Sequence, residues 1–420
     1  MHKLNRVATP DTATSSARKI PMLQPLRHAR FRQLWLASLV SNLGTWTQTF
    51  AAAWLVASGD PSSHMTALVQ AAACAPMLVF GLLAGVVADA APRARLLLAV
   101  NAFRALAAAL MAVLAAGGQA SAWSVLALVF MMGTAQAFMW PAWHAVTSLL
   151  VAPDEVEAAA TLNNLSYNVA ATAGPALGGA LFAWCGAAPL FAFTALSMTG
   201  LLAVYYAWQR SPDAPRAGAT VSMDAFRAGL RAAFGAADYR RLLRHTACAL
   251  FGAVAFMALL PLYVRDVLQR EAGMYGGLMA LLSAGAIAAP FVLPALRVRY
   301  PRHVLVAVSL ALFGAMLATL PLVRHPALLA PLVMAGGMAW AAMISTLNGA
   351  AQSAFPSSVR ARTLSVYLLA MALGQTVGSA AWGVVAEWLG VSPALALAGT
   401  VLLLYAACGL RRAIPATMAQ

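Results

Sequence analysis

Long apolar segments separated by short polar turns make up most of this chain. The segment Met65–Ala88 is apolar over about 24 residues, more than the roughly 20 that a helix needs to cross a bilayer. Asp89, Arg93 and Arg95 follow in a charged turn, after which the chain becomes apolar again. This stretch therefore predicts two membrane-spanning helices joined by a tight turn.

The same pattern recurs along the whole sequence and predicts an all-α integral membrane protein with twelve transmembrane helices. Apolar runs of this length favour helices, because a membrane β-barrel would show alternating polar and apolar positions. The expected cores of the spans are 33–57, 65–88, 96–116, 122–149, 158–184, 188–208, 242–264, 274–296, 303–323, 327–352, 364–388 and 393–410.

The second half of the chain repeats the first. The pair Pro92-Arg93 matches Pro301-Arg302, and Gly174, Gly179 and Gly186 match Gly378, Gly383 and Gly390. Each half holds six spans, so the copies share one topology and form two pseudo-symmetric six-helix bundles around a central path. The expected organisation is a tail (1–29), a first bundle (30–208), a linker (209–238), a second bundle (239–412) and a tail (413–420).

Composition and charge support this interpretation. The chain is 62% hydrophobic and only 9% charged, whereas soluble domains carry roughly 25% charged residues. The net charge of +15 comes from the turns, and with the N-terminus inside, all but four of the 27 Lys and Arg lie on the inner side. The positive-inside rule then places both termini in the cytoplasm, where the charges meet anionic lipid and not nucleic acid.

Two motifs resemble the major facilitator superfamily. In the turn after the second span, Gly85, Ala88, Asp89 and Arg93 match the superfamily pattern G-x-L-A-D-R-x-G-R-R, while its first arginine and second glycine are missing. In the fifth span, the segment Gly174–Gly179 resembles the G-P-x-x-G-G end of the antiporter signature.

A closer resemblance is to the enterobactin-exporter-like subgroup, also called transmembrane secretion effectors. The first span carries Ser41–Gln48 and then Trp54-Leu55-Val56, in the subgroup's pattern S-N-L-G-x-W-x-Q…W-L-V. Similar matches occur at Phe138–Ala142, Ala158–Asn164 and Arg360–Tyr367. The resemblance covers about residues 30–412 and implies export by alternating access across the bacterial inner membrane.

The resemblance also assigns expected roles to residues. A latch that joins the inner ends of the halves in the outward-open state would consist of Gly85, Asp89, Arg93, Arg95, Arg360 and Arg362. Bending of the fifth span is expected at Gly174, Pro175, Gly178 and Gly179, with simple close packing as the alternative. Polar residues in the spans that commonly line the path are the cavity candidates: Asn42, Gln48, Gln136, Asn163, Asn164, Tyr167, Asn168, Tyr367 and Gln375.

One charge lies inside a predicted span. Arg104 is eight to nine residues into the third span, roughly 12–14 Å deep by helix rise. A charge at that depth should face the protein interior and have a partner, for which Asp89 is one candidate. Arg104 is therefore expected either in a structural ion pair or in substrate binding or ion coupling.

The expected function is secondary transport of a small molecule, a siderophore or a drug-like compound, by a monomer coupled to protons. The middles of the spans hold no carboxylate, so a proton would use Asp89, His144 or the cargo itself. A lysophospholipid flippase of the same fold and a non-transporting membrane sensor are the alternatives. No cofactor, metal cluster or Walker loop is indicated, so the chain is not expected to be an enzyme or to use ATP.

Overall fold

Twelve long helices form the chain in the computed structural model, which describes residues 23–147, 150–210 and 230–410. Several side chains within these ranges, Asp89 and His144 among them, lie outside the description. The first six long helices are α1 (Ala29–Gly59), α2 (Ser63–Ala90), α3 (Arg93–Ala116), α4 (Ala122–Thr147), α5 (Val156–Cys185) and α6 (Ala187–Gln209). The second six are α8 (Ala237–Leu262), α9 (Ala272–Arg299), α10 (Arg302–Thr319), α11 (Pro326–Ser353), α12 (Ser357–Leu389) and α13 (Val391–Leu410).

The helices begin where the sequence offers caps or prolines. The Ser62 hydroxyl accepts a hydrogen bond from the Met65 N–H and so caps α2. Pro92, Pro301 and Pro356 occupy the positions just before α3, α10 and α12. Since proline lacks an N–H and cannot continue a preceding helix, these residues separate neighbouring spans with very short turns.

The internal repeat is visible in the turns between the last two helices of each half. Gly186, between α5 and α6, and Gly390, between α12 and α13, have positive φ angles of 72° and 89°. A side chain is strained at such angles, so the turn favours glycine at both places. The match between Gly186 and Gly390 in the sequence therefore reflects the same type of turn in both halves.

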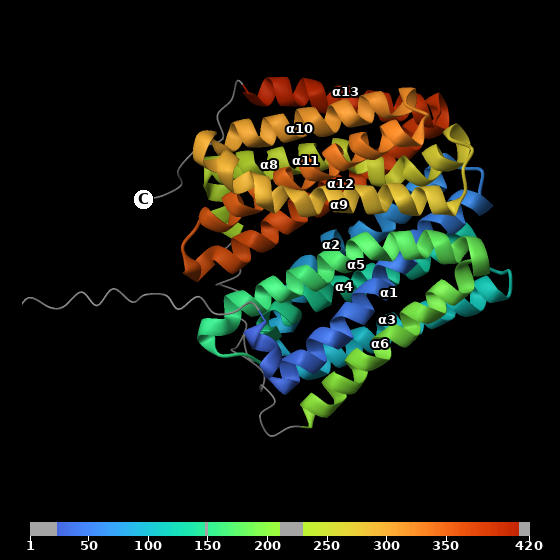
Figure 1. Cartoon of the computed structure of the whole chain (residues 1–420). Helices are drawn as coiled ribbons and strands as arrows, with labels where there is room; N and C mark the ends of the chain where they lie inside the picture. Colours follow the sequence, from blue (N-terminus) through green and yellow to red (C-terminus); the bar gives the residue numbers. More distant parts are fainter. Residues whose placement is uncertain (1–22, 148–149, 211–229, 411–420) are drawn as a thin grey trace, which may run out of the picture.

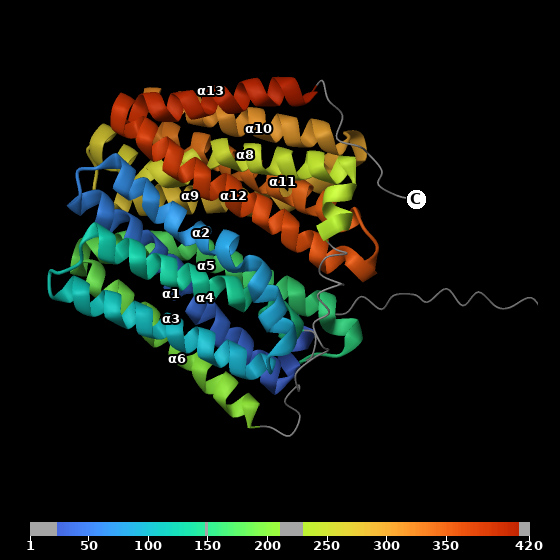
Figure 2. The same cartoon turned by 180° about the vertical axis from the view of Figure 1, so that it is seen from behind.

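Packing within the halves follows one scheme. In the first half α1 packs on α5 and α6, α3 on α6, and α2 on α4; in the second, α8 packs on α12 and α13, α10 on α13, and α9 on α11. The two halves lie side by side with their helices roughly aligned (Figure 1). They meet along two seams, one between α2 and α12, which is in front in Figure 2, and one between α5 and α9.

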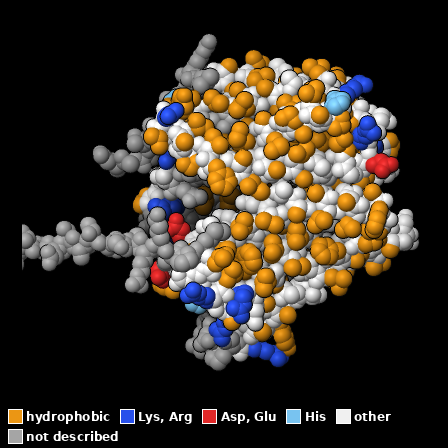
Figure 3. Space-filling model, viewed as in Figure 1, with side chains coloured by type: hydrophobic (Ala, Val, Ile, Leu, Met, Phe, Trp, Pro, Cys, Tyr) orange, Lys and Arg blue, Asp and Glu red, His pale blue; other side chains and the backbone are white. Residues whose placement is uncertain are grey.

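Within the described residues, ten of the twelve long helices are long and apolar enough to span a membrane. The helices α1 and α5 do not meet this criterion of length and composition. Both carry polar residues singled out in the sequence, Asn42 and Gln48 on α1 and Asn164 and Asn168 on α5. On the face shown in Figure 3, charged side chains lie near the two ends and the middle is apolar. The predicted all-α membrane fold is confirmed.

Candidate functional site

The space between the two halves is the candidate site, and its geometry differs between the two ends of the bundle. We call the end at the turn between α1 and α2, where Asp60 lies, the tied end. The opposite end holds the turn between α2 and α3. On the face in Figure 3 the surface is hollowed between the halves toward the opposite end.

Charged side chains of the second half bind helix termini of the first half at the tied end. The Glu387 carboxylate of α12 accepts hydrogen bonds from the His64 N–H (3.1 Å) and the Ser62 hydroxyl (3.2 Å) at the start of α2. The Arg265 guanidinium, in the π-helical segment Tyr263–Val267, donates to the carbonyl oxygens of Ala57 and Asp60 at the end of α1. A carboxylate at a helix N-terminus and a guanidinium at a C-terminus both complement the helix dipole.

Aromatic rings from α1 and α9 also pack against one another across the two halves. Tyr275 of α9 stacks on Phe50 of α1, with ring centroids 4.7 Å apart, and on Trp54 at 5.8 Å. Phe50 is 2% exposed and Tyr275 is 4% exposed. This three-ring stack joins α1 of the first half to α9 of the second half.

The seam between α5 and α9 depends on glycine. A Cβ added at Gly179 would lie 2.8 Å from the Ala272 carbonyl oxygen and 3.2 Å from the Gly276 Cα. A Cβ at Gly276 would collide with the Pro175 carbonyl oxygen. Further along, the Ser283 hydroxyl donates to the Ala171 carbonyl oxygen at 2.9 Å. The two backbones therefore approach closely across the halves.

The other residues predicted for bending pack inside the first half. A Cβ at Gly174 would meet Trp46 and Thr47 of α1, and one at Gly178 would meet the Phe50 ring. The α5 helix is continuous through Pro175. Close packing against α1 accounts for Gly174 and Gly178 in this conformation.

A polar stripe lies on α5 toward the opposite end. Asn164, Tyr167 and Asn168 are all exposed, and they share one helix face by their three- and four-residue spacing. The Tyr167 ring, 40% exposed, makes edge contacts with Trp46 of α1 at 5.7 Å and Trp140 of α4 at 6.2 Å between centroids. This surface presents amides beside an aromatic cluster.

Four other cavity candidates are not part of that stripe. Their hydrogen-bond partners and burial could not be predicted from the sequence. Asn42 donates to the Ser166 hydroxyl at 3.3 Å and joins α1 to α5. Gln48, 5% exposed, donates to the sulfur of Met132 inside the first half. Tyr367 is fully buried in the second half, and Gln375 accepts a hydrogen bond from the Cys74 thiol (3.1 Å) in the seam between α2 and α12. Gln136 and Asn163 are half-buried.

Arg104 lies inside the first half and is 3% exposed. Its Nη2 donates to the Thr45 hydroxyl at 2.8 Å, and its Nη1 faces the Asn101 side-chain oxygen at 3.4 Å and the Met139 sulfur at 3.3 Å. Its Nε has no hydrogen-bond partner among the described residues. These partners are all neutral, and the side chain of Asp89, the partner considered from the sequence, lies outside the description.

The residues predicted for the latch lie at the opposite end. Arg93 and Arg95 begin α3, and Arg360 and Arg362 lie in the first turns of α12. Arg95, Arg360 and Arg362 are exposed, and Arg360 donates to the carbonyl oxygen of Phe355, in its own half, at 3.3 Å. A Cβ added at Gly85 would meet no neighbouring helix or described side chain within 4 Å. The Asp89 side chain, the centre of the predicted latch, lies outside the described residues.

Sequence reasoning missed the residues that join the halves at the tied end. In the sequence, Arg265 is only one of the few basic residues that do not fall on the inner side, and Glu387 and Tyr275 have no local motif. Their partners lie more than 200 residues away along the chain, for example Ala57 for Arg265 and His64 for Glu387. Among the described residues, no group of three or more His, Cys, Asp and Glu could hold a metal ion.

Two aligned six-helix halves that meet along two seams have the fold of major facilitator transporters. Solved structures of such transporters are similar to the chain. A bacterial homologue of the human lysosomal transporter Spinster, in an inward-facing and unoccupied conformation, has a TM-score of 0.72 at 14% identity, covering 92% of this chain and 96% of that one. The nucleoside transporter NupG has a TM-score of 0.74 at 13% identity, covering 91% and 99%. An inward-facing bacterial homologue of the iron transporter ferroportin has a TM-score of 0.66 at 16% identity, covering 90% and 98%.

The family itself is defined by sequence. The model of the transmembrane secretion effector family matches residues 20–420, so the chain belongs to that family. No curated protein matches the sequence significantly. The protein is thus a membrane-embedded transporter of the major facilitator superfamily.

Proposed function

We propose that this protein exports a small amphiphilic molecule across the bacterial inner membrane by alternating access, as a monomer with both termini in the cytoplasm. The observation that carries the proposal is the asymmetry between the two ends. Glu387 and Arg265 join the halves at the tied end, while the polar residues Asn164 and Asn168 are exposed toward the opposite end. With the opposite end in the cytoplasm, this conformation is ready to receive cargo from inside.

The polar stripe on α5 supports an amphiphilic cargo. An exposed carboxamide is unfavourable against lipid, so Asn164 and Asn168 are assigned to the path between the halves. Tyr167 and its two tryptophan neighbours add aromatic surface beside these amides. Amides next to aromatic rings suit a polar but mostly uncharged molecule, and the likeness to enterobactin exporters favours a siderophore or a drug-like compound.

Release on the far side requires the halves to rock. Opening would break the contacts of Glu387 and Arg265, and closing of the opposite end would bring the α2–α3 turn toward the start of α12. Arg93, Arg95, Arg360 and Arg362 would then form the latch with Asp89. Protons are the proposed coupling ion, with Asp89 and His144 as the carriers to be tested first.

Sided labelling tests this account in a variant whose four native cysteines are replaced by serine. Asn168→Cys should react with a membrane-impermeant maleimide in inside-out vesicles and stay unlabelled in intact cells. Glu271→Cys, exposed at the tied end, is the control and should show the reverse pattern. Labelling of Asn168→Cys from outside intact cells would overturn the proposed orientation.

Transport itself needs a separate measurement. Inside-out vesicles that contain the protein should accumulate an amphiphilic dye such as ethidium, or a catecholate siderophore, when a proton gradient is applied. Labelled lysophospholipid in the same assay separates the lipid-flippase alternative. If none of these compounds is transported, the membrane-sensor alternative is favoured.

A further inference from the structure

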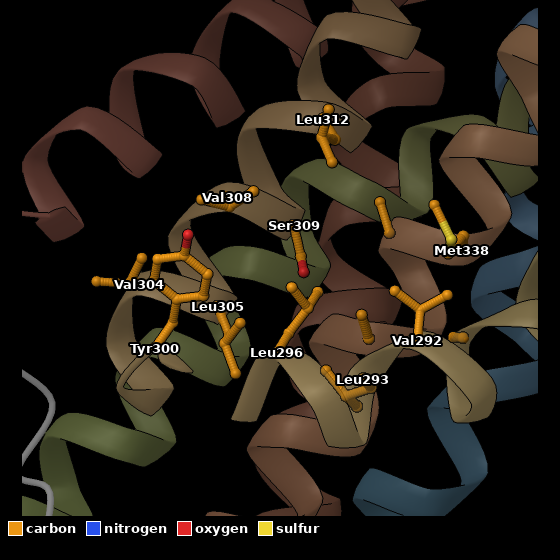
Figure 4. Close-up of a pocket in the computed structure, with 13 residues that line it drawn as sticks. Val292, Leu293, Leu296, Tyr300, Val304, Leu305, Val308, Ser309, Leu312 and Met338 are labelled. Atoms are coloured by element: carbon orange, nitrogen blue, oxygen red, sulfur yellow. The ribbon is translucent and has the colours of Figure 1, made fainter. Parts of the chain in front are cut away.

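A groove of about 380 Å³ lies on the outside of the second half, between α9 and α10 with α11 beneath it. Its walls are almost entirely apolar, and small residues such as Ala289 and Ala342 leave the space open. In Figure 4, Tyr300 and Val304 lie at one end of the groove, and Leu312 and Met338 lie toward the other. Its volume is in the range of sites that hold small molecules, roughly 300–1,000 Å³.

The groove faces the membrane and not the central path. Val308 and Leu312 on its rim are 47% and 50% exposed, and neighbouring Phe291 is 83% exposed. Large apolar side chains that are exposed on a membrane-spanning bundle contact lipid tails. The natural occupant of an apolar groove in this position is therefore a lipid chain.

The length of the groove matches one leaflet. On α9 its lining runs from Ala289 to Tyr300, which is about 16 Å by helix rise. Tyr300 directly follows the last residue of α9, so the groove starts at the membrane surface and ends near the bilayer centre. The hydrocarbon core is about 30 Å thick, so one leaflet spans about half of that distance.

Three arginines surround the surface end of the groove. Arg297 donates to the Ser345 hydroxyl (3.1 Å) and Arg302 to the Ser353 hydroxyl (3.0 Å). Arg299 is exposed and has no hydrogen-bond or ionic partner among the described residues. The sequence contains no Asp or Glu between Glu271 and Glu387, so α9, α10 and α11 offer no carboxylate to these charges.

We propose that the groove binds one acyl chain of an anionic phospholipid, whose phosphate contacts Arg299 and Arg302. The apolar walls take the chain, and the unpaired positive charge at the surface end selects a negative headgroup. The site is separate from the proposed cargo path, so it stands or fails independently of the export proposal.

The test uses the purified full-length protein in detergent and counts retained lipid by native mass spectrometry. We expect one phosphatidylglycerol per chain to survive detergent washing, and phosphatidylcholine to be retained about tenfold less. Ala342→Phe fills the groove floor and should lower phosphatidylglycerol retention about tenfold, because the chain loses buried methylenes. Arg299→Gln combined with Arg302→Gln should abolish the preference for the anionic lipid while neutral lipid is still bound.

A second variant covers the case in which Ala342→Phe fails to fold. Val308→Trp places an indole on the groove rim and should have the same effect, whereas Leu404→Trp, on the lipid-exposed face of α13, should leave retention unchanged. Equal retention by the groove variants and Leu404→Trp would overturn the site. Equal binding of the two lipids would overturn headgroup selection. If instead a membrane protein copurifies and phosphatidylglycerol does not displace it, that protein and not a lipid occupies the groove, which would also overturn the proposal.

Discussion

The Glu387 carboxylate of α12 accepts a hydrogen bond from the backbone N–H of His64, 3.1 Å away in the first turn of α2. The two residues belong to opposite halves of the molecule and are separated by 323 positions in the chain. Arg265 makes the matching contact at the neighbouring helix end, where it donates to the Asp60 carbonyl oxygen at 3.0 Å. Each charge lies at the helix terminus of opposite partial charge, so the tied end is held by helix dipoles as well as by hydrogen bonds.

Replacing Glu387 by Gln should weaken the tied end without removing much volume. The negative charge at the start of α2 contributes about 1 kcal/mol, so its loss should shift the population toward opening at this end about fivefold. Maleimide labelling of Tyr275→Cys from outside intact cells, in the background without native cysteines, measures this opening. Glu271→Gln removes an exposed carboxylate from the same end and should change nothing. Equal labelling in the two variants would contradict the assignment.

The seam between α5 and α9 can be tested with two neighbouring glycines. Gly276→Ala should destabilise the protein by about 1–3 kcal/mol, because the new Cβ meets the Pro175 carbonyl oxygen and the backbone of Gly179. Gly277 has open space within 4 Å of a built Cβ, so Gly277→Ala should leave stability unchanged or raise it by about 1 kcal/mol through better helix propensity.

Thermal unfolding in detergent checks this pair, and the transport rate of each variant is measured alongside. If Gly276→Ala unfolds at the same temperature as Gly277→Ala, the close approach of the two helices is not required.

The sequence predicts the fold well because its signals are local. The run Met65–Ala88 lies within α2 (Ser63–Ala90), and Pro92 and Pro301 precede equivalent helices in the two halves. Apolar length and proline position fix such elements without any knowledge of tertiary contacts.

The site could be predicted only in part, because a polar residue inside a span does not reveal which way it faces. Tyr367 and Tyr167 are both tyrosines in spans that the family resemblance predicts to line the path, yet Tyr367 is fully buried and Tyr167 is 40% exposed. Glu387 looks like an ordinary interfacial residue until α2 is placed against it. Contacts between the halves depend on how the two bundles meet, and no local pattern encodes that arrangement.

Arg104 should matter more for transport than for stability. Its described partners Thr45, Asn101 and Met139 are neutral, so Arg104→Gln removes a buried charge while keeping a hydrogen-bond donor near Thr45. Burying a charge costs several kcal/mol of lost solvation, a cost that the neutral Gln side chain avoids. We therefore expect an unchanged or higher unfolding temperature.

Transport by Arg104→Gln should respond differently. On the hypothesis that the Arg104 charge takes part in substrate binding and contributes about 1.4 kcal/mol to the binding of an anion, export of an anionic dye into inside-out vesicles should fall about tenfold, while export of a neutral dye is retained. Arg270→Gln, which removes an exposed arginine at the tied end, is the control. Equal loss for both dyes would show that Arg104 acts only on the structure.

The last prediction concerns pH and a contact at the membrane surface. The His28 Nε2 donates to the Glu155 carboxylate at 2.6 Å and connects the start of α1 to the short helix Pro153–Glu155 that precedes α5. Burial raises the pKa of Glu155, but the hydrogen bonds from His28 and from the Ala152 N–H outweigh it, so the pKa lies below the usual carboxyl value.

A lowered pKa in the folded state means that the contact stabilises the protein at pH values above the ordinary carboxyl pKa of about 4.3. This contribution is lost as the pH falls further, through the lowered pKa of the folded protein. Unfolding temperatures measured from neutral to acidic pH should therefore drop less steeply in Glu155→Gln than in the wild type. Asp154→Asn, one residue away and exposed, should retain the wild-type slope. A Glu155→Gln profile parallel to the wild type would show that this carboxylate does not contribute to acid sensitivity.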